Sequence, residues 1–178
     1  MRRAALLFAG IASLLLSTCL WAFEPDTSDE MQLDVARAII DIKKADPGIE
    51  KFFEGAAGYA VIPKVGKAGM GVGGAYGKGL VIVDDKAVGR TTLSQITVGF
   101  QLGGQVYSQF IFFKDEAALQ TFQRGNFEMG AQASAVAVTL GASADADYDK
   151  GVAVFTNVGG GLMYEATISG QKFKYEAL

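Results

Sequence analysis

The sequence predicts an α+β fold in which N-terminal helices pack on a strongly curved, mostly antiparallel β-sheet or a partly closed barrel. Apolar residues recur at helical spacing up to about residue 45 and alternate with period two from Gly55 onward. Glycine makes up 23 of the 178 residues, and many of these glycines lie inside predicted strands, which favours a tightly coiled sheet. The period changes only once, so we expect a single domain over residues 23–178.

The composition excludes several functional classes. The chain has no histidine, which excludes Ser-His-Asp and Cys-His catalysis and histidine-ligated metals. Its single cysteine, Cys19, excludes an internal disulfide and a cysteine metal cluster. A formal charge of −3 argues against a general nucleic-acid-binding protein. Carboxylates are available for catalysis, but no pair of them stands out. We therefore predict a protein that is not an enzyme and needs no cofactor.

Residues 1–22 are predicted to be a secretory signal peptide. Arg2 and Arg3 form a short basic start, and residues 4–16 follow without a charge. A membrane anchor is the alternative, because the apolar run reaches about twenty residues when it is counted to Phe23. The small residues after the apolar run favour cleavage.

Two cleavage positions compete. Leu16-Ser17-Thr18-Cys19 resembles a bacterial lipobox, although threonine is unusual directly before the cysteine. In that case Cys19 becomes the lipidated first residue, and the following Leu20 resembles outer-membrane sorting. The rival is ordinary cleavage after Ala22, which would leave a soluble periplasmic protein. Either cut removes both leader arginines and changes the formal charge from −3 to −5.

The first helix is predicted from Ser28 to about Ala45. Thr27-Ser28-Asp29-Glu30 reads as a capping box, with Thr27 as the N-cap. Asp46-Pro47-Gly48 ends the helix, and a short second helix over Ile49–Glu54 follows. The apolar stripe that should face the sheet consists of Met31, Val35, Ala38, Ile39 and Ile42.

Strands are predicted next, over residues 57–62, 69–76, 80–83, 87–98 and 100–113. The last of these is the clearest, with a predicted bulge at Gly103-Gly104. One of its faces should point into the core, and it carries Phe100, Leu102, Val106, Phe110 and Phe112. The other should face solvent, and it carries Gln101, Gln105, Tyr107 and Gln109.

The C-terminal part should begin with a helix over Asp115–Gln123, capped by Asp115, with Leu119 and Phe122 buried. A long alanine-rich strand over residues 127–140 should follow, then a loop over 142–150 whose acids lack calcium-loop spacing. The predicted end of the chain is a strand over 151–156, a glycine turn over 157–161, and a hairpin of residues 163–168 and 171–175.

The segment from Gly55 to Gly79 is rich in glycine and contains Lys64, Lys67 and Lys78 without an acidic residue. These lysines could receive an anionic head group, with glycine amides as further donors, or they could form a solvated rim. Residues 69–74 match G-x-G-x-x-G, but no helix can open after them, so we reject a dinucleotide site.

Several motifs in this order resemble the SYLF domain family. They are Tyr59-Ala60-Val61-Ile62-Pro63-Lys64-Val65-Gly66-Lys67-Ala68-Gly69, Gly73-Gly74-Ala75-Tyr76-Gly77-Lys78-Gly79, Val98-Gly99-Phe100-Gln101-Leu102-Gly103-Gly104-Gln105 and Gly130-Ala131-Gln132-Ala133-Ser134. The segment Gly151 to Tyr164 is similar to the strand and glycine turn near the family's end. The resemblance covers about 130 residues, nearly the whole chain after the leader.

This resemblance implies a non-catalytic domain that associates with phospholipid or a membrane surface. On the matching positions, Lys64, Lys67, Tyr76 and Lys78 are the expected head-group contacts. Some eukaryotic members bind actin, but an exported bacterial protein would not normally meet it. The alternative is a soluble periplasmic structural or protein-interaction module without a lipid ligand, which presents the face of Gln101, Gln105, Tyr107 and Gln109 to an envelope protein.

Overall fold

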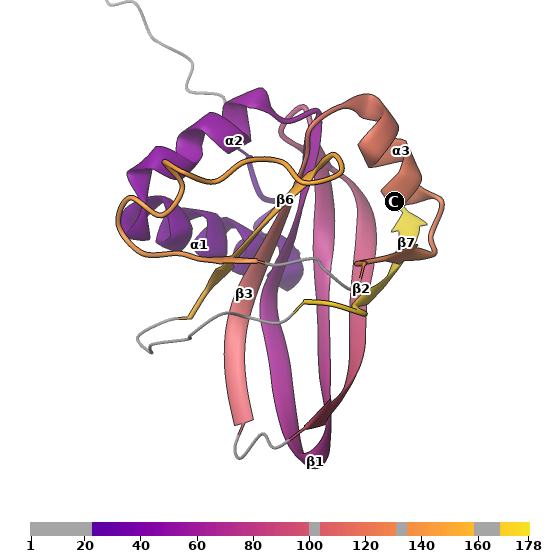
Figure 1. Cartoon of the computed structure of the whole chain (residues 1–178). Helices are drawn as coiled ribbons and strands as arrows, with labels where there is room; N and C mark the ends of the chain where they lie inside the picture. Colours follow the sequence, from indigo (N-terminus) through magenta and orange to yellow (C-terminus); the bar gives the residue numbers. More distant parts are fainter. Residues whose placement is uncertain (1–22, 100–103, 131–134, 159–167) are drawn as a thin grey trace, which may run out of the picture.

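The computed structural model describes residues 23–99, 104–130, 135–158 and 168–178 (Figure 1). Its helices are α1 (Glu30–Ala45), η1 (Pro47–Ile49), α2 (Glu50–Gly55) and α3 (Glu116–Gln123). Its strands are β1 (Gly58–Val83), β2 (Lys86–Gly99), β3 (Gly104–Phe113), β4 (Phe127–Glu128), β5 (Val136–Ala137), β6 (Val152–Asn157) and β7 (Lys172–Ala177). The predicted α+β fold with a curved sheet is confirmed.

The strands form one sheet in the order β4-β7-β2-β1-β3-β6-β5, in which only the β5–β6 pair is parallel. β1 is 26 residues long and turns back on itself at the bottom of Figure 1. Its first arm, 58–68, pairs with β3, and its second arm, 71–83, pairs with β2. The three separate strands predicted between 57 and 83 are therefore one continuous element.

The sheet curls into a half-barrel. The side chains of Gln109 in β3 and Gln171, just before β7, hydrogen-bond at 2.8 Å although β1 and β2 separate these strands in the sheet. This contact identifies the concave face. Leu119 and Phe122 of α3 pack against that face. Met129, Ile168 and Phe173, which follow α3 in the sequence, belong to the same core.

The predicted solvent-facing side of β3 is a core face from Tyr107 onward, whereas Gln105 is exposed as predicted. Tyr107 and Gln109 are 3% and 0% exposed, and Ile111 and Phe113 continue their face into the concave core. The opposite face of β3 is buried at Phe110 and Phe112 as well. Both faces are therefore enclosed over most of the strand, because the curled sheet covers one side and the helices cover the other. Gln101 lies outside the described residues, as do Phe100, Leu102 and the Gly103 of the predicted bulge.

The helices α1 and α2 cover the convex face. The predicted stripe is confirmed: Val35, Ala38, Ile39 and Ile42 are buried, and Met31 packs beside them. They meet a cluster of aromatic rings that consists of Phe52 of α2 and of Tyr59, Phe110, Phe112 and Phe155 of the sheet. The short helix predicted over Ile49–Glu54 is present as α2, shifted by one residue.

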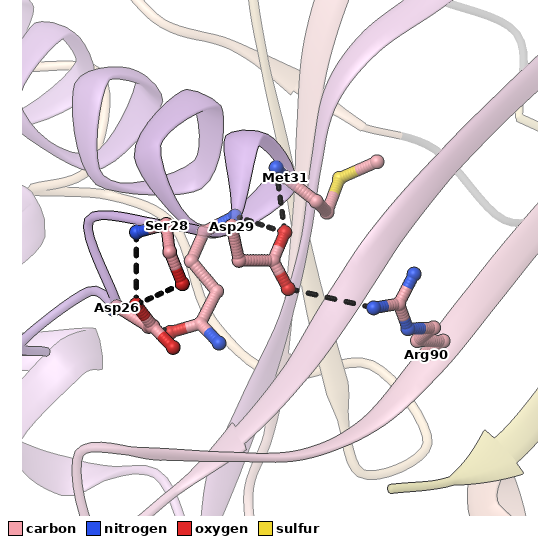
Figure 2. Close-up of polar contacts among 6 residues, drawn as sticks. Asp26, Ser28, Asp29, Met31 and Arg90 are labelled. Carbon is pink, nitrogen blue, oxygen red and sulfur yellow. Dashed lines mark hydrogen bonds and ion pairs between the residues drawn. The ribbon is translucent and has the colours of Figure 1, made fainter.

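The start of α1 differs from the prediction. The N-cap is Asp29, not Thr27: an oxygen of Asp29 accepts from the Met31 amide at 2.9 Å (Figure 2). Asp26 forms a turn of its own by accepting from the amide and hydroxyl of Ser28. The other Asp29 oxygen lies 3.4 Å from the Arg90 guanidinium of β2, so this residue both caps the helix and ties it to the sheet. A carboxylate also suits the positive end of the helix dipole better than a hydroxyl.

The helix α3 is confirmed, with Asp115 capping the Ala118 amide at 2.9 Å.

The prediction of one long strand over 127–140 is wrong. β4 pairs with β7 at one edge of the sheet, whereas β5 pairs with β6 at the opposite edge. Residues assigned to opposite edges cannot form one strand. The alanines at 131 and 133 lie outside the described residues, as do the glycines at 159–161 and the first half of the predicted C-terminal hairpin.

Candidate functional site

The four predicted head-group contacts divide between the two faces of the sheet. Leu80 faces the helices on the convex side of the sheet. Lys78 and Tyr76 precede it by two and four residues in the same strand, so their side chains point to the same side. Lys64 reaches Asp34 of α1 at 2.7 Å, so it lies on the same side. Lys67 follows Val65 of the concave core by two residues in an unbroken register with β3. It therefore belongs to the concave face.

The convex face extends beyond the end of α1, where the β1 hairpin projects toward the bottom of Figure 1. Three large apolar side chains are exposed on this part of the sheet: Tyr76 at 54%, Ile96 at 83% and Val106 at 63%. We call the set of Lys64, Tyr76, Lys78, Ile96 and Val106 the tip surface.

The register explains why these apolar side chains stand out. Ile96 lies opposite Gly74, and Val106 lies opposite Gly66. A carbon placed at the Cβ position of Gly66 would have the Tyr76 carbonyl oxygen as its nearest neighbour, at 4.0 Å, so these two arms run side by side. Glycine partners bury little of the neighbouring side chains, and the apolar groups project from a shallow surface.

Two ion pairs join α1 to the sheet at the edge of this surface. The Lys64–Asp34 pair is 2.7 Å long, and the Lys64 side chain is 69% exposed. The hydrogen bond from Lys64, aided by its charge and by Arg37, holds the pKa of Asp34 below its usual value. The second pair joins Arg90 to Asp29. Exposed pairs of this kind contribute little to stability, so Lys64 can exchange its partner at small cost.

The concave face has a different chemistry. The amides of Gln109 and Gln171 pair reciprocally, at 2.8 Å and 3.2 Å, and Gln95 donates to the Ser169 carbonyl at 3.0 Å. Burial raises the pKa of Tyr107 to about 12, against a lowering contribution from Gln171. These are satisfied, neutral groups that hold the chain before β7 against the sheet. Burial also lowers the pKa of Lys67.

Metal chemistry and membrane-spanning helices find no support within the described ranges. There, no cluster of three or more histidine, cysteine or acidic side chains is arranged to hold a metal. Over the same ranges, no helix combines the length and the apolar character needed to cross a bilayer. The predicted leader and Cys19 lie outside these ranges.

A model of the family described as "Las17-binding protein actin regulator" (Ysc84) matches residues 94–176. This stretch runs from the second half of β2 into β7. The SYLF resemblance is confirmed there. The matched SYLF segment contains Ile96 and Val106 of the tip surface, whereas Lys64, Tyr76 and Lys78 precede it.

A curated protein of Aeromonas veronii, beta cell expansion factor A, is 28% identical to this chain over 155 residues. The alignment covers 84% of this chain and 59% of that protein. The chain thus spans about three fifths of the length of this curated relative. The SYLF family is known as a family of binding domains.

Sequence reasoning missed Ile96, Val106 and Asp34 as parts of this surface. Strand parity offers a signal for Ile96, which shares its parity with the exposed Ser94, but not for Val106, whose parity neighbours Ser108 and Phe110 are buried. Parity also separates Lys67 from Lys64, which are three residues apart in one strand. The pairing of Asp34 with Lys64 joins residues 30 positions apart and has no local signature.

Proposed function

We propose that this is a non-catalytic envelope protein that binds phospholipid through the tip surface. The observation that carries the proposal is the arrangement of this surface on the convex face. Lys64 and Lys78 lie nearest to α1, and Tyr76, Ile96 and Val106 lie beside them or closer to the end of the hairpin. Cations next to exposed apolar side chains match the order of groups in a phospholipid, whose phosphate lies above its acyl chains.

Simple energetics supports a reversible association. A lysine near an anionic membrane surface contributes about 1 kcal/mol, and apolar area removed from water contributes about 25 cal/mol per Å². Two lysines and three partly exposed apolar side chains would therefore give weak to moderate affinity. The domain as a whole is acidic, so binding depends on this local surface and not on the net charge.

A lipid anchor would add to this association. We propose that the chain is exported, that Cys19 carries acyl groups, and that the protein is an outer-membrane lipoprotein. Such an anchor would hold the tip surface close to a bilayer, so that even a weak intrinsic affinity suffices. Replacing Cys19 with alanine should then release the protein from the membrane fraction. Continued retention of Cys19→Ala would contradict the anchor.

The surface predicted for the protein-interaction alternative is reduced, because Tyr107 and Gln109 are buried and Gln105 alone of its described residues is exposed. The description of the matching family names an actin regulator that binds Las17. No feature of this chain's described surface favours an actin-related partner over phospholipid.

Vesicle co-sedimentation tests the proposal. Lys64→Glu with Lys78→Glu should reduce binding to vesicles of phosphatidylglycerol and phosphatidylethanolamine about tenfold or more, and added salt should weaken wild-type binding. The matched control is Lys114→Glu with Lys174→Glu, which reverses two exposed charges elsewhere. Lys67→Glu should have little effect, since Lys67 lies on the concave face. Equal vesicle binding by the two double variants would contradict a role for the tip surface.

A further inference from the structure

A second surface lies at the other end of α1, where a cavity of about 820 Å³ opens between the helices and the sheet. Its walls come from α1, α2, the start of β1 and the turn between β1 and β2. They are largely apolar and include Phe23, Ile39, Ile40, Phe53, Tyr59 and Ile82. The side chain of Ile40 is 52% exposed although it lines this cavity. An apolar cavity of this size fits several side chains of a ligand.

The rim of the cavity is acidic. Glu50, Glu54, Asp84 and Asp85 line it together with one cation, Lys43. The Lys43 ammonium is already engaged, because it pairs with Glu50 at 2.9 Å and lies 4.5 Å from the centre of the Phe53 ring. In the part of the chain that the structure describes, the ion pairs leave Glu54, Asp84 and Asp85 without a basic partner.

Two local features reinforce this charge. Asp84 and Asp85 form a two-residue turn in which both have positive φ, 47° and 59°, so the turn presents adjacent carboxylates at the cavity. Inside the cavity, the pKa of the Tyr59 hydroxyl is raised, mainly by burial and further by the negative charges of Asp85 and Glu50. The potential at this cavity is therefore negative, opposite in sign to that of the tip surface.

We infer that this cavity is a docking site for an amphipathic segment of a partner protein that presents apolar side chains together with lysine or arginine. Charge complementarity selects this occupant: an anionic phospholipid would meet three unpaired carboxylates, whereas a cationic segment would pair with them. The apolar anchors enter between Ile40 and Phe53, and the basic group meets the Asp84-Asp85 turn. This site is independent of phospholipid binding at the tip surface.

Two fluorescently labelled peptides test the inference on the full chain. One is a short amphipathic peptide of leucine, alanine and lysine, and the other has glutamate in place of each lysine. By fluorescence anisotropy, the lysine peptide should bind the wild-type protein and the glutamate peptide should bind far more weakly. Asp84→Asn with Asp85→Asn should weaken binding of the lysine peptide about three- to tenfold. Asparagine tolerates positive φ, so the turn should be retained.

Two further variants separate the cavity from general charge effects. Asp145→Asn with Glu176→Gln removes two exposed carboxylates away from the cavity and should leave peptide binding unchanged. Ile40→Ser removes an exposed part of the apolar wall and should weaken binding of the lysine peptide without unfolding the protein.

Three results would overturn the inference. They are no binding of either peptide, equal binding of both, and an equal effect of the cavity and control double variants. The phospholipid proposal is tested separately, because the double variant Asp84→Asn with Asp85→Asn should leave vesicle binding intact. A loss of vesicle binding in Ile40→Ser would instead assign the cavity to lipid and would also overturn the inference.

Discussion

Lys64 of β1 and Asp34 of α1 form a 2.7 Å ion pair at the boundary between the covered and uncovered parts of the convex sheet face. On one side of the pair, the apolar stripe of α1 packs on the aromatic rings of the sheet. On the other side, the tip surface is open. The pair therefore couples the packing of the helix to the availability of a cation that we assign to head-group binding.

Asp34→Asn should strengthen binding to anionic vesicles. The substitution frees the Lys64 ammonium from its partner, and an exposed pair contributes about 0.2–1 kcal/mol, so affinity should rise by up to about fivefold. Vesicle co-sedimentation at low salt measures this change. Asp41→Asn is the matched control, since Asp41 is an exposed acid on the same helix. A gain of the same size in both variants would show that only net charge matters.

Asp46 should make a pH-dependent contribution to stability. It is 1% exposed, and its carboxylate accepts from the amides of Gly48, Gly141 and Ser143. Burial opposes its ionisation, but these hydrogen bonds outweigh burial and lower the pKa of Asp46. The stabilisation is therefore fully present above the ordinary pKa of about 3.9 and is lost as pH falls through the lower folded value.

Asp46→Asn should thus reduce the free energy of unfolding by about 1–3 kcal/mol at neutral pH, because it places an amide among buried donors. Urea unfolding at neutral and at acidic pH measures the difference from wild type, which should shrink at acidic pH. Asp145→Asn, an exposed acid in the loop whose Gly141 and Ser143 amides donate to Asp46, should change little. A difference that stays constant with pH would contradict a role for the ionised carboxylate.

The Gln109–Gln171 pair should show strong energetic coupling. Gln109→Leu or Gln171→Leu removes both reciprocal bonds from the remaining buried amide, although Gln171 keeps long contacts to Gln95 and Tyr107, and should cost about 1–3 kcal/mol. The double variant should cost about 1 kcal/mol less than the sum of the single variants. A double-mutant cycle from urea unfolding measures this coupling. Strict additivity would show that the two amides do not hold the concave face together.

Gly79→Ala should destabilise the β1 hairpin. A Cβ at position 79 would collide with the carbonyl oxygen of Val61 in the other arm, where neither backbone can move freely. We expect a loss of about 1–3 kcal/mol, visible as a lower Tm. Gly66→Ala in the same strand has its nearest atom at 4.0 Å and should be neutral or slightly stabilising. Equal Tm values for the two variants would contradict the close approach of the arms.

Local signals predicted much of the fold. The stripe of α1, the Asp115 cap of α3 and the extent of β2 all depend on residues close in sequence, and all are confirmed. The faces of β3 could not be predicted in this way. Alternation shows that a strand has two faces, but whether the second face meets water depends on the curl of the sheet. Here Gln171, 62 residues away, encloses Gln109.

The candidate site was predictable only where it depends on residues close in sequence. The glycine-rich segment and its lysines are visible in the sequence, and Lys64, Tyr76 and Lys78 do share one face. The exposure of Ile96 and Val106 depends on where α1 ends over the sheet, which is a tertiary feature. The Asp29 cap shows a related limit: Thr27 and Asp29 are both good caps, and the bond to Arg90 in β2 favours the second.

Contact between the tip surface and the hydrocarbon of a bilayer is the central claim, and a tryptophan placed at position 96 tests it most directly. In a Trp21→Phe background, the fluorescence emission of the tryptophan in Ile96→Trp should shift to the blue when anionic vesicles are added. Brominated acyl chains in those vesicles should quench this fluorescence. Leu140→Trp, exposed at 82% in wild type but away from the tip surface, should show neither effect. Vesicle binding that leaves the emission of Ile96→Trp unchanged, or quenching of Leu140→Trp instead, would contradict the account.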